Sequence, residues 1–223
     1  MNAGCPGTAL GWGKPLRRCF DYSFGALQIC IGGQCRPCRV SLLKIPMTQI
    51  TILRADITTR PLDAIVNAAN STLLGGGGVD GAIHDAAGPE LLAECRTLGG
   101  CAVGQAKATK AYGLHPVKHV IHTVGPIFGR EPERDAQLLA SCYEQSLTLA
   151  FDLRCKSVAF PSISTGAYGY PIEEASRIAL GAIRRFVSEN PGAIDLIEIV
   201  TFSHRDYNAY QRVYIQGLGI SKG

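Results

Sequence analysis

The 223-residue chain lacks any long apolar run: no stretch approaches the roughly 18 consecutive apolar residues that a membrane-spanning helix needs. We therefore expect no membrane partner. Methionine is also scarce and occurs only at Met1 and Met47. Regular strand and helix patterns begin just after Met47, so we predict a folded domain at residues 47–223 and an N-terminal extension at residues 1–46.

An excess of positive charge is absent from the predicted domain, although the whole chain has a formal charge of +4. The extension holds six basic residues and one acidic residue, whereas the domain holds 16 basic and 17 acidic residues. A protein that binds nucleic acid presents a basic surface to the phosphate backbone. The domain is therefore predicted not to bind nucleic acid.

Cysteine is sparse in the domain and concentrated in the extension. Four scattered cysteines in the domain are typical of buried thiols in a reducing compartment, so we expect a cytoplasmic protein. In the extension, Cys30, Cys35 and Cys38 have part of the spacing of a zinc site. Because no second pair at ligand spacing accompanies them, we predict no metal.

The extension is predicted to be disordered, or to be a translated upstream or mis-started segment. Its stretch from Cys19 to Gly33 is mildly apolar and follows two arginines, as in a signal or transit sequence. Asp21 interrupts that stretch, and no small-residue cleavage pattern follows it.

Strand-like and helix-like patterns alternate along the domain, which predicts a three-layer α/β fold with helices on both faces of a sheet. Strands are predicted at residues 49–56, 63–69, 106–112, 118–125, 157–164 and 195–202. Helices are predicted at residues 80–95, 134–153, 171–189 and 206–215. Such domains bind ligands in a crevice beyond the carboxyl ends of the strands.

Two loops rich in small residues follow predicted strands and lead into predicted helices. The first is Ser71 to Val79 and contains the run Gly75 to Gly78; the second is Ser162 to Tyr170. Backbone N–H groups of such a turn beside a helix N-terminus bind anions without obstruction by side chains. Two such loops predict that a diphosphate is held from both sides.

The spacing Gly76-x-Gly78-x-x-Gly81 formally matches the dinucleotide-binding fingerprint. In that fingerprint the first glycine directly follows the strand, and an acidic residue about 20 positions later binds the ribose. Here residues 71–75 intervene, and no such acid lies near Gly99. We therefore predict no nicotinamide cofactor.

Four polar residues, Asn67, Asn70, Asp80 and His84, fall within eighteen positions at one strand-to-helix junction. Each has a structural explanation: the aspartate could cap the helix, the asparagines could close a turn, and the histidine could be structural. His84 follows Asp80 by four residues, so it lies on the same helix face and could reach it. Their convergence favours a functional site.

At these residues the chain resembles the macrodomain family, and within it the bacterial type of O-acetyl-ADP-ribose deacetylases and ADP-ribosyl-acceptor hydrolases. The resemblance covers residues 47 to about 215 and implies a mixed, mostly parallel central sheet, no cofactor and a monomer. Its motifs are "ADIT" (55–58), "IVNAANSTLLGGGGVDGAIHDAAGPELL" (65–92), "HTVGP" (122–126) and "VAFPSISTGAYGYP" (158–171).

The resemblance implies that Asp56 recognises the adenine amino group, helped by the backbone of Ile57. Asn70 would hold the distal ribose, and Asp80 would accept a proton from, or orient, the attacking water. Asn67 and His84 complete the implied catalytic group. The backbone at Gly78 and Val79 would approach the distal ribose and phosphate, and the second diphosphate loop would be Ser164, Thr165, Gly166, Ala167 and Tyr168.

The resemblance implies a hydrolase that acts on O-acetyl-ADP-ribose and on proteins mono-ADP-ribosylated at acidic side chains. The alternative is an ADP-ribose reader without catalysis; members that only bind often lack the acid and histidine after the glycine run. Two departures stand out. Ala55 replaces the usual glycine, and "FSHRDYNAY" (202–210) replaces an acid-rich turn, which leaves Phe202 and Tyr207 as candidates for stacking on adenine.

Overall fold

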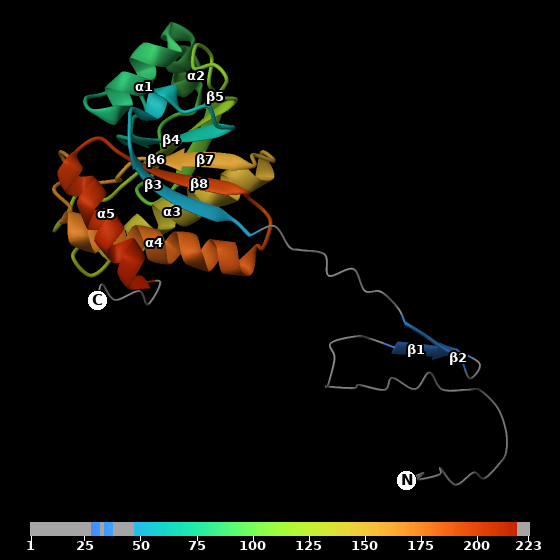
Figure 1. Ribbon diagram of the computed structural model, residues 1–223. Coiled ribbons are helices and arrows are strands. Elements are labelled where there is room, and N and C mark those ends of the chain that lie inside the picture. The colour runs from blue at the N-terminus through green and yellow to red at the C-terminus, as the bar shows by residue number, and fades with distance from the viewer. Residues whose placement is uncertain (1–27, 32–33, 38–46, 218–223) are drawn as a thin grey trace. The chain divides into compact units, whose positions relative to one another are not determined.

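The computed structural model describes residues 28–31, 34–37 and 47–217 (Figure 1). The chain divides into two units, Met1–Lys44 and Ile45–Gly223. In the first unit, β1 (Gln28–Ile31) pairs antiparallel with β2 (Gln34–Pro37). Cys38 of the cysteine pattern lies outside the described residues. That residues 1–46 are a disordered extension, or a translated upstream or mis-started segment, stays a prediction.

The second unit is built on a six-stranded sheet with the order β3-β8-β7-β4-β6-β5. Strand β5 runs antiparallel to its neighbour β6, and every other pair is parallel. The predicted mixed, mostly parallel sheet is therefore confirmed. The strands are β3 (Gln49–Arg54), β4 (Ala64–Ala69), β5 (Ala106–Lys110), β6 (His119–Val124), β7 (Ser157–Phe160) and β8 (Leu196–Thr201).

Helices cover both faces of this sheet, which confirms the predicted three layers (Figure 1). Helices α1 (Val79–Ala87) and α2 (Pro89–Thr97) lie on one face. The other face carries α3 (Asp135–Asp152), α4 (Ile172–Glu189) and α5 (His204–Gly217). None of the helices in the described part of the chain has the length and apolar character to cross a membrane.

Strand β4 shows how the sheet divides the core. Ala64 and Val66 pack into the core beneath α3, α4 and α5, whereas Ile65 and Ala69 pack into the core beneath α1 and α2. Successive side chains of a strand point to opposite faces, so both faces of this strand are apolar. Asn67 shares the α1 and α2 face with Ile65 and is fully buried there. A buried amide on an apolar face requires polar partners nearby.

Several predicted strands end one to four residues earlier than expected, and two of the differences from prediction have a clear local cause. The strand predicted to reach residue 164 stops at Phe160, because Pro161 has no N–H to donate to a neighbouring strand. The helix predicted over residues 80–95 is two helices, which separate at Gly88 with a φ of +88°. All four domain cysteines are buried and free, which confirms their prediction as buried thiols.

Candidate functional site

A cavity of about 840 Å³ lies at the carboxyl edge of the sheet. Its wall includes the residues that directly follow the parallel strands: Ala55 after β3, Asn70 after β4, Gly125 after β6, Pro161 after β7 and Phe202 after β8. This edge is where the sequence predicted a ligand crevice. We call this space the ligand cavity.

The structure brings every residue of the implied ligand-binding set to the ligand cavity. The two remaining members of the implied catalytic group, Asn67 and His84, do not line it and lie behind Asp80. The lining members are Asp56, Ile57, Asn70, Gly78, Val79, Asp80, Ser164, Thr165, Gly166, Ala167 and Tyr168.

The glycine run forms the first loop of the cavity wall, and bare backbone is required at one point in the run and at one point in the helix that follows it. Gly78 is the N-cap of α1 and has a φ of +63°, which side chains rarely tolerate. A Cβ on Gly81 would meet Gly76 O at 2.6 Å, so the helix and the loop pack backbone against backbone. Among the described residues, no acceptor takes the N–H groups of Gly76, Gly77 or Gly78.

The second loop opposes the first and is closed by its own backbone. Tyr170 N donates to Ser164 O at 2.9 Å, and Gly169 N donates to Gly166 O at 2.9 Å. The N–H groups of residues 165–168 donate to no atom of the described chain. A Cβ on Gly166 would have no heavy atom within 4 Å, so that position opens to the cavity. The two loops together present the unpaired amides of an anion site.

Asp80 is the buried carboxylate of the cavity wall, and only 3% of its surface is exposed. The hypothesis that it caps the helix is wrong, because α1 begins earlier: the N-cap is Gly78, and no side chain caps this helix. Asp80 Oδ1 instead accepts a hydrogen bond of 2.6 Å from Asn67 Nδ2. Asp80 Oδ2 is buried and has no hydrogen-bond partner within the described residues.

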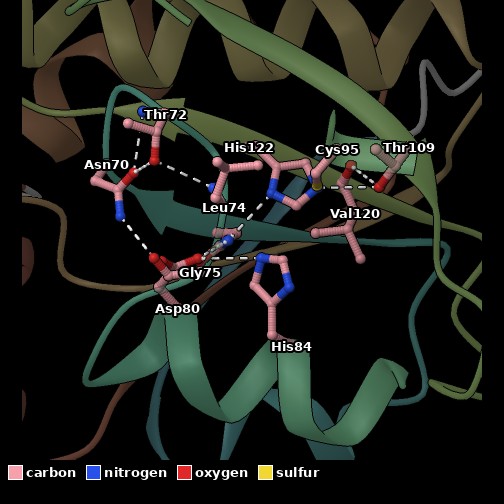
Figure 2. A network of polar contacts seen from close by, with 11 residues as sticks. Asn70, Thr72, Leu74, Gly75, Asp80, His84, Cys95, Thr109, Val120 and His122 are labelled. Carbon is pink, nitrogen blue, oxygen red and sulfur yellow. Dashed lines mark hydrogen bonds and ion pairs between the residues drawn. The ribbon is translucent and has the colours of Figure 1, made fainter. Parts of the chain in front are cut away.

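His84 lies one turn after Asp80 on α1, as the spacing predicted (Figure 2). Its Nε2 is 3.6 Å from Asp80 Oδ1, which is beyond ordinary hydrogen-bond length. That nitrogen is buried and has no partner among the described residues. His84 therefore forms part of the surroundings of the Asp80 carboxylate, on the side away from the cavity.

A chain of hydrogen bonds leads from Asp80 into the core. Asn67 Nδ2 also lies 3.1 Å from His122 Nδ1. An amide nitrogen can only donate a hydrogen bond, so Asn67 is the donor and His122 Nδ1 is the acceptor. His122 must then carry its proton on Nε2, which lies 3.0 Å from Thr109 Oγ1 (Figure 2). Strand register makes this possible, since Asn67 of β4 stands opposite His122 of β6.

Burial keeps His122 neutral and able to accept from Asn67. It lowers the pKa of the imidazole to about 4, with a smaller contribution from His84, whose ring centroid lies 6.2 Å away. The uncharged Cys95 thiol is a further titratable group beside this ring, with its Sγ 3.7 Å from Nε2. Protonation of His122 Nδ1 would replace the acceptor with a donor and break the bond to Asn67.

Folding stability is expected to fall between pH 6.5 and pH 4 because of His122. The unfolded chain binds a proton at this histidine below about pH 6.5, whereas the folded protein resists it until about pH 4. The contribution of neutral His122 to the free energy of unfolding is therefore fully present above pH 6.5. It declines by on the order of 2 kcal/mol by pH 4.5. Urea unfolding at pH 7 and pH 4.5 measures this drop.

The matched variants are His122→Gln and His204→Gln. His122→Gln lowers stability at pH 7 but removes the titrating group, so we expect a smaller drop between the two pH values. His204 is exposed on α5, so its replacement should leave the drop unchanged. Equal drops in wild type and His122→Gln would contradict the role of this histidine.

Asn70 and Asn67 differ in their surroundings. The prediction that an asparagine closes a turn is confirmed for Asn70, whose Oδ1 accepts from Thr72 N at 3.0 Å and whose Nδ2 donates to Gly75 O at 2.8 Å (Figure 2). It is wrong for Asn67, which bridges Asp80 and His122. Asn70 thus fixes the first loop while lining the cavity.

The end of the ligand cavity next to β3 and β8, away from Asn70, contains Asp56 and Phe202. Asp56 Oδ1 accepts from Thr58 N at 2.9 Å and so caps the short 3-10 helix Ile57–Thr59. Phe202 is 88% exposed at the cavity rim, whereas Tyr207 does not line the cavity and packs against the core. Of the two aromatic candidates for stacking, Phe202 has the required position.

Three side chains behind the site could together hold a metal ion: His84, Cys95 and His122 offer ligand atoms within 4.8 Å of one another. The pKa of the Cys95 thiol is raised to about 11, chiefly by burial, so the thiolate that binds metals is disfavoured. Both His122 nitrogens already contact polar atoms. His122 is thus engaged in the hydrogen-bond chain rather than free to bind a metal.

No functional role was predicted for His122, Thr109 or Cys95. A signal was present: His122 sits in the apolar strand "HVIHTV", on the same strand face as Val120 and Val124. A polar residue within such a stripe is buried and needs partners. Its partners come from β4, β5 and α2, and no local pattern links those segments.

The sequence of the chain is similar to a known protein family and to characterised relatives. A family model described as Macro domain matches residues 66–179. A macro domain-containing protein of Chlorobaculum tepidum is 54% identical over 168 residues, which cover 75% of this chain and 96% of that protein. The ADP-ribose glycohydrolase MACROD2 of Xenopus laevis is 53% identical over 165 residues, which cover 74% of this chain but only 39% of that relative.

Solved structures agree with this relationship. The Oceanobacillus iheyensis macrodomain with ADP is 44% identical with a TM-score of 0.75, and the match covers 79% of this chain and 95% of that one. The Trypanosoma brucei macrodomain in complex with ADP-ribose is 46% identical with a TM-score of 0.70, covering 74% and 68%.

Proposed function

Because the chain belongs to the macro domain family, we propose that it binds ADP-ribose in the ligand cavity and hydrolyses esters at the distal ribose. Its substrates are O-acetyl-ADP-ribose and proteins mono-ADP-ribosylated on acidic side chains. The observation that carries this proposal is the buried Asp80 carboxylate, which lines the cavity between two loops of unpaired amides.

The two loops suit the diphosphate of ADP-ribose. The amides of Gly76 to Gly78 and of residues 165–168 have no acceptor in the described chain, so a phosphate oxygen can accept from each loop. Asp56 and Phe202 suit the adenine at the far end, where a carboxylate can accept from an amino group and a ring can stack. Asn70 and Tyr168 suit the distal ribose.

Asp80 suits the role of proton acceptor for the attacking water. Its Oδ1 is held by the hydrogen bond from Asn67, and its Oδ2 has no partner among the described residues. The water oxygen forms a bond to the ester carbonyl carbon while its proton passes to Asp80 Oδ2. The bond from that carbon to the ribose oxygen then breaks, and the ribose oxygen takes up the proton. General-base assistance of this kind contributes about 10² to 10⁴ in rate.

The diphosphate of the bound substrate lies beside the water and is a second acceptor for its proton. Asp80 therefore orients the water and shares with the diphosphate the role of accepting that proton. In a modified protein the carboxylate ester sits on the anomeric carbon of the ribose. Either of its two C–O bonds can break to give the same products. We propose that the water attacks the carbonyl carbon, which leaves the anomeric oxygen in ADP-ribose.

Release of acetate from O-acetyl-ADP-ribose by the purified full chain is the first expected result. With a protein modified on glutamate, the reaction in ¹⁸O-water should place the label in the released carboxylate and none in ADP-ribose. Label in ADP-ribose would show attack at the anomeric carbon and overturn that step. ADP-ribose binding without release of either product would instead identify a reader.

A further inference from the structure

A second hollow, of about 300 Å³, adjoins the ligand cavity. The two spaces share Gly125 and Tyr168 in their walls. Ser71, which follows Asn70 in sequence, also lines the second hollow. The shared wall therefore lies at the Asn70 end of the ligand cavity, where the proposed function places the distal ribose. We call the second space the side hollow.

The side hollow has an apolar wall that faces solvent. Val103 is 39% exposed and Ile127 is 42% exposed, and Pro126 lies between Ile127 and the shared Gly125. Large apolar side chains exposed next to a binding cavity mark a surface for a further apolar group.

The loop that forms this wall is fixed in place by hydrogen bonds. The buried Asp135 carboxylate accepts from Gly129 N at 2.7 Å and from Glu131 N at 3.2 Å. Phe128 N donates to Tyr168 O at 2.9 Å, which ties the loop to the wall shared with the ligand cavity. A surface that is already ordered binds without a large loss of conformational entropy.

The charged residues that line the side hollow are Arg130 and two carboxylates. Glu131 is paired with Arg134 at 2.8 Å, and Asp135 is occupied by two backbone amides. Arg130 lines the hollow and forms no ion pair with any residue that the structure describes. An acidic side chain next to an apolar one is the complementary partner.

We propose that the side hollow binds the polypeptide that flanks an ADP-ribosylated aspartate or glutamate, with an apolar side chain against Val103 and Ile127 and an acidic neighbour at Arg130. This inference rests on the proposed function. An acetyl group ends one carbon beyond its carbonyl, whereas a modified side chain continues into a chain that must leave the ligand cavity. The side hollow adjoins the end where that chain leaves.

The test compares two substrates with one set of variants. Val103→Asp and Ile127→Asp place a carboxylate in the apolar wall, and each should lower kcat/KM for a mono-ADP-ribosylated protein about tenfold. For O-acetyl-ADP-ribose, kcat/KM should stay within about twofold. Phe151→Asp is the matched control, because Phe151 is 48% exposed at the opposite end of α3, and it should change neither substrate.

Arg130→Ala tests the charge with two ADP-ribosylated peptides that differ only in flanking glutamates or glutamines. The variant should lower kcat/KM for the glutamate peptide about fivefold and leave the glutamine peptide unchanged. Equal losses with both peptides, or equal losses with protein and O-acetyl-ADP-ribose in the aspartate variants, would overturn the proposal.

A protein that hydrolyses neither substrate would contradict the proposed function but leave this inference testable by calorimetry. In that case Ile127→Asp should weaken binding of the ADP-ribosylated peptide about tenfold and leave the affinity for free ADP-ribose unchanged. Unchanged affinity for both ligands would overturn the side hollow as a peptide site.

Discussion

Asp80→Ala is expected to lower turnover of O-acetyl-ADP-ribose by about 10² to 10⁴ while leaving ADP-ribose affinity within a few-fold of wild type. The variant removes the carboxylate that is proposed to orient and deprotonate the water. It leaves the backbone amides of both loops, which are proposed to hold the diphosphate, in place. Steady-state acetate release gives the turnover, and calorimetry with ADP-ribose gives the affinity.

The control is Asp85→Ala, which removes the same charge from the same helix. Asp85 is exposed and does not line the ligand cavity, so both turnover and affinity should match wild type. Unfolding midpoints should accompany the kinetics, because Asn67 loses an acceptor in Asp80→Ala and a lost buried hydrogen bond costs about 1 to 3 kcal/mol. Unchanged turnover in a folded Asp80→Ala protein would contradict the catalytic role.

The layers of the fold were predictable because each strand and helix has a local period. Strand β4 reads as an apolar run, and α3 repeats apolar residues at three and four positions. Element ends were harder, because they depend on single residues. Pro161 ended β7 early, and the positive φ of Gly78 placed the start of α1 ahead of Asp80.

The shift of that helix start changes the interpretation of Asp80. As an N-cap its carboxylate would bond to the helix amides, whereas in the first turn it bonds to Asn67. The difference is two residues, which the period of a helix cannot resolve. The cavity loops were predictable, since a glycine run is a strong local signal for bare backbone.

The hydrogen-bond chain behind Asp80 was not predictable in the same way. Asn67 and His122 are 55 residues apart and meet because β4 and β6 pair in one register. A one-residue change in that register would put the two side chains on opposite faces of the sheet. Local patterns contain no register, so the partner of Asn67 is known only from the folded structure.

Gly166→Glu is expected to weaken ADP-ribose binding by about a hundredfold or more. The position has no neighbour within 4 Å of a Cβ and lines the cavity, so a side chain there enters the space between the two loops. A carboxylate in that space repels the diphosphate, and like charges at close range cost several kcal/mol, with 1.4 kcal/mol for each tenfold loss. Calorimetry with ADP-ribose measures the effect.

Two further variants are controls, one for the size of the new side chain and one for the added negative charge. Gly166→Gln has the same shape without the charge and should weaken binding less than Gly166→Glu. Gly181→Glu adds the same charge at an exposed, open position of α4 and should leave affinity unchanged. Because the φ of Gly166 lies outside the range that favours glycine, the cavity variants should fold like wild type. Unaltered affinity in Gly166→Glu would therefore mean that the diphosphate does not lie against the second loop.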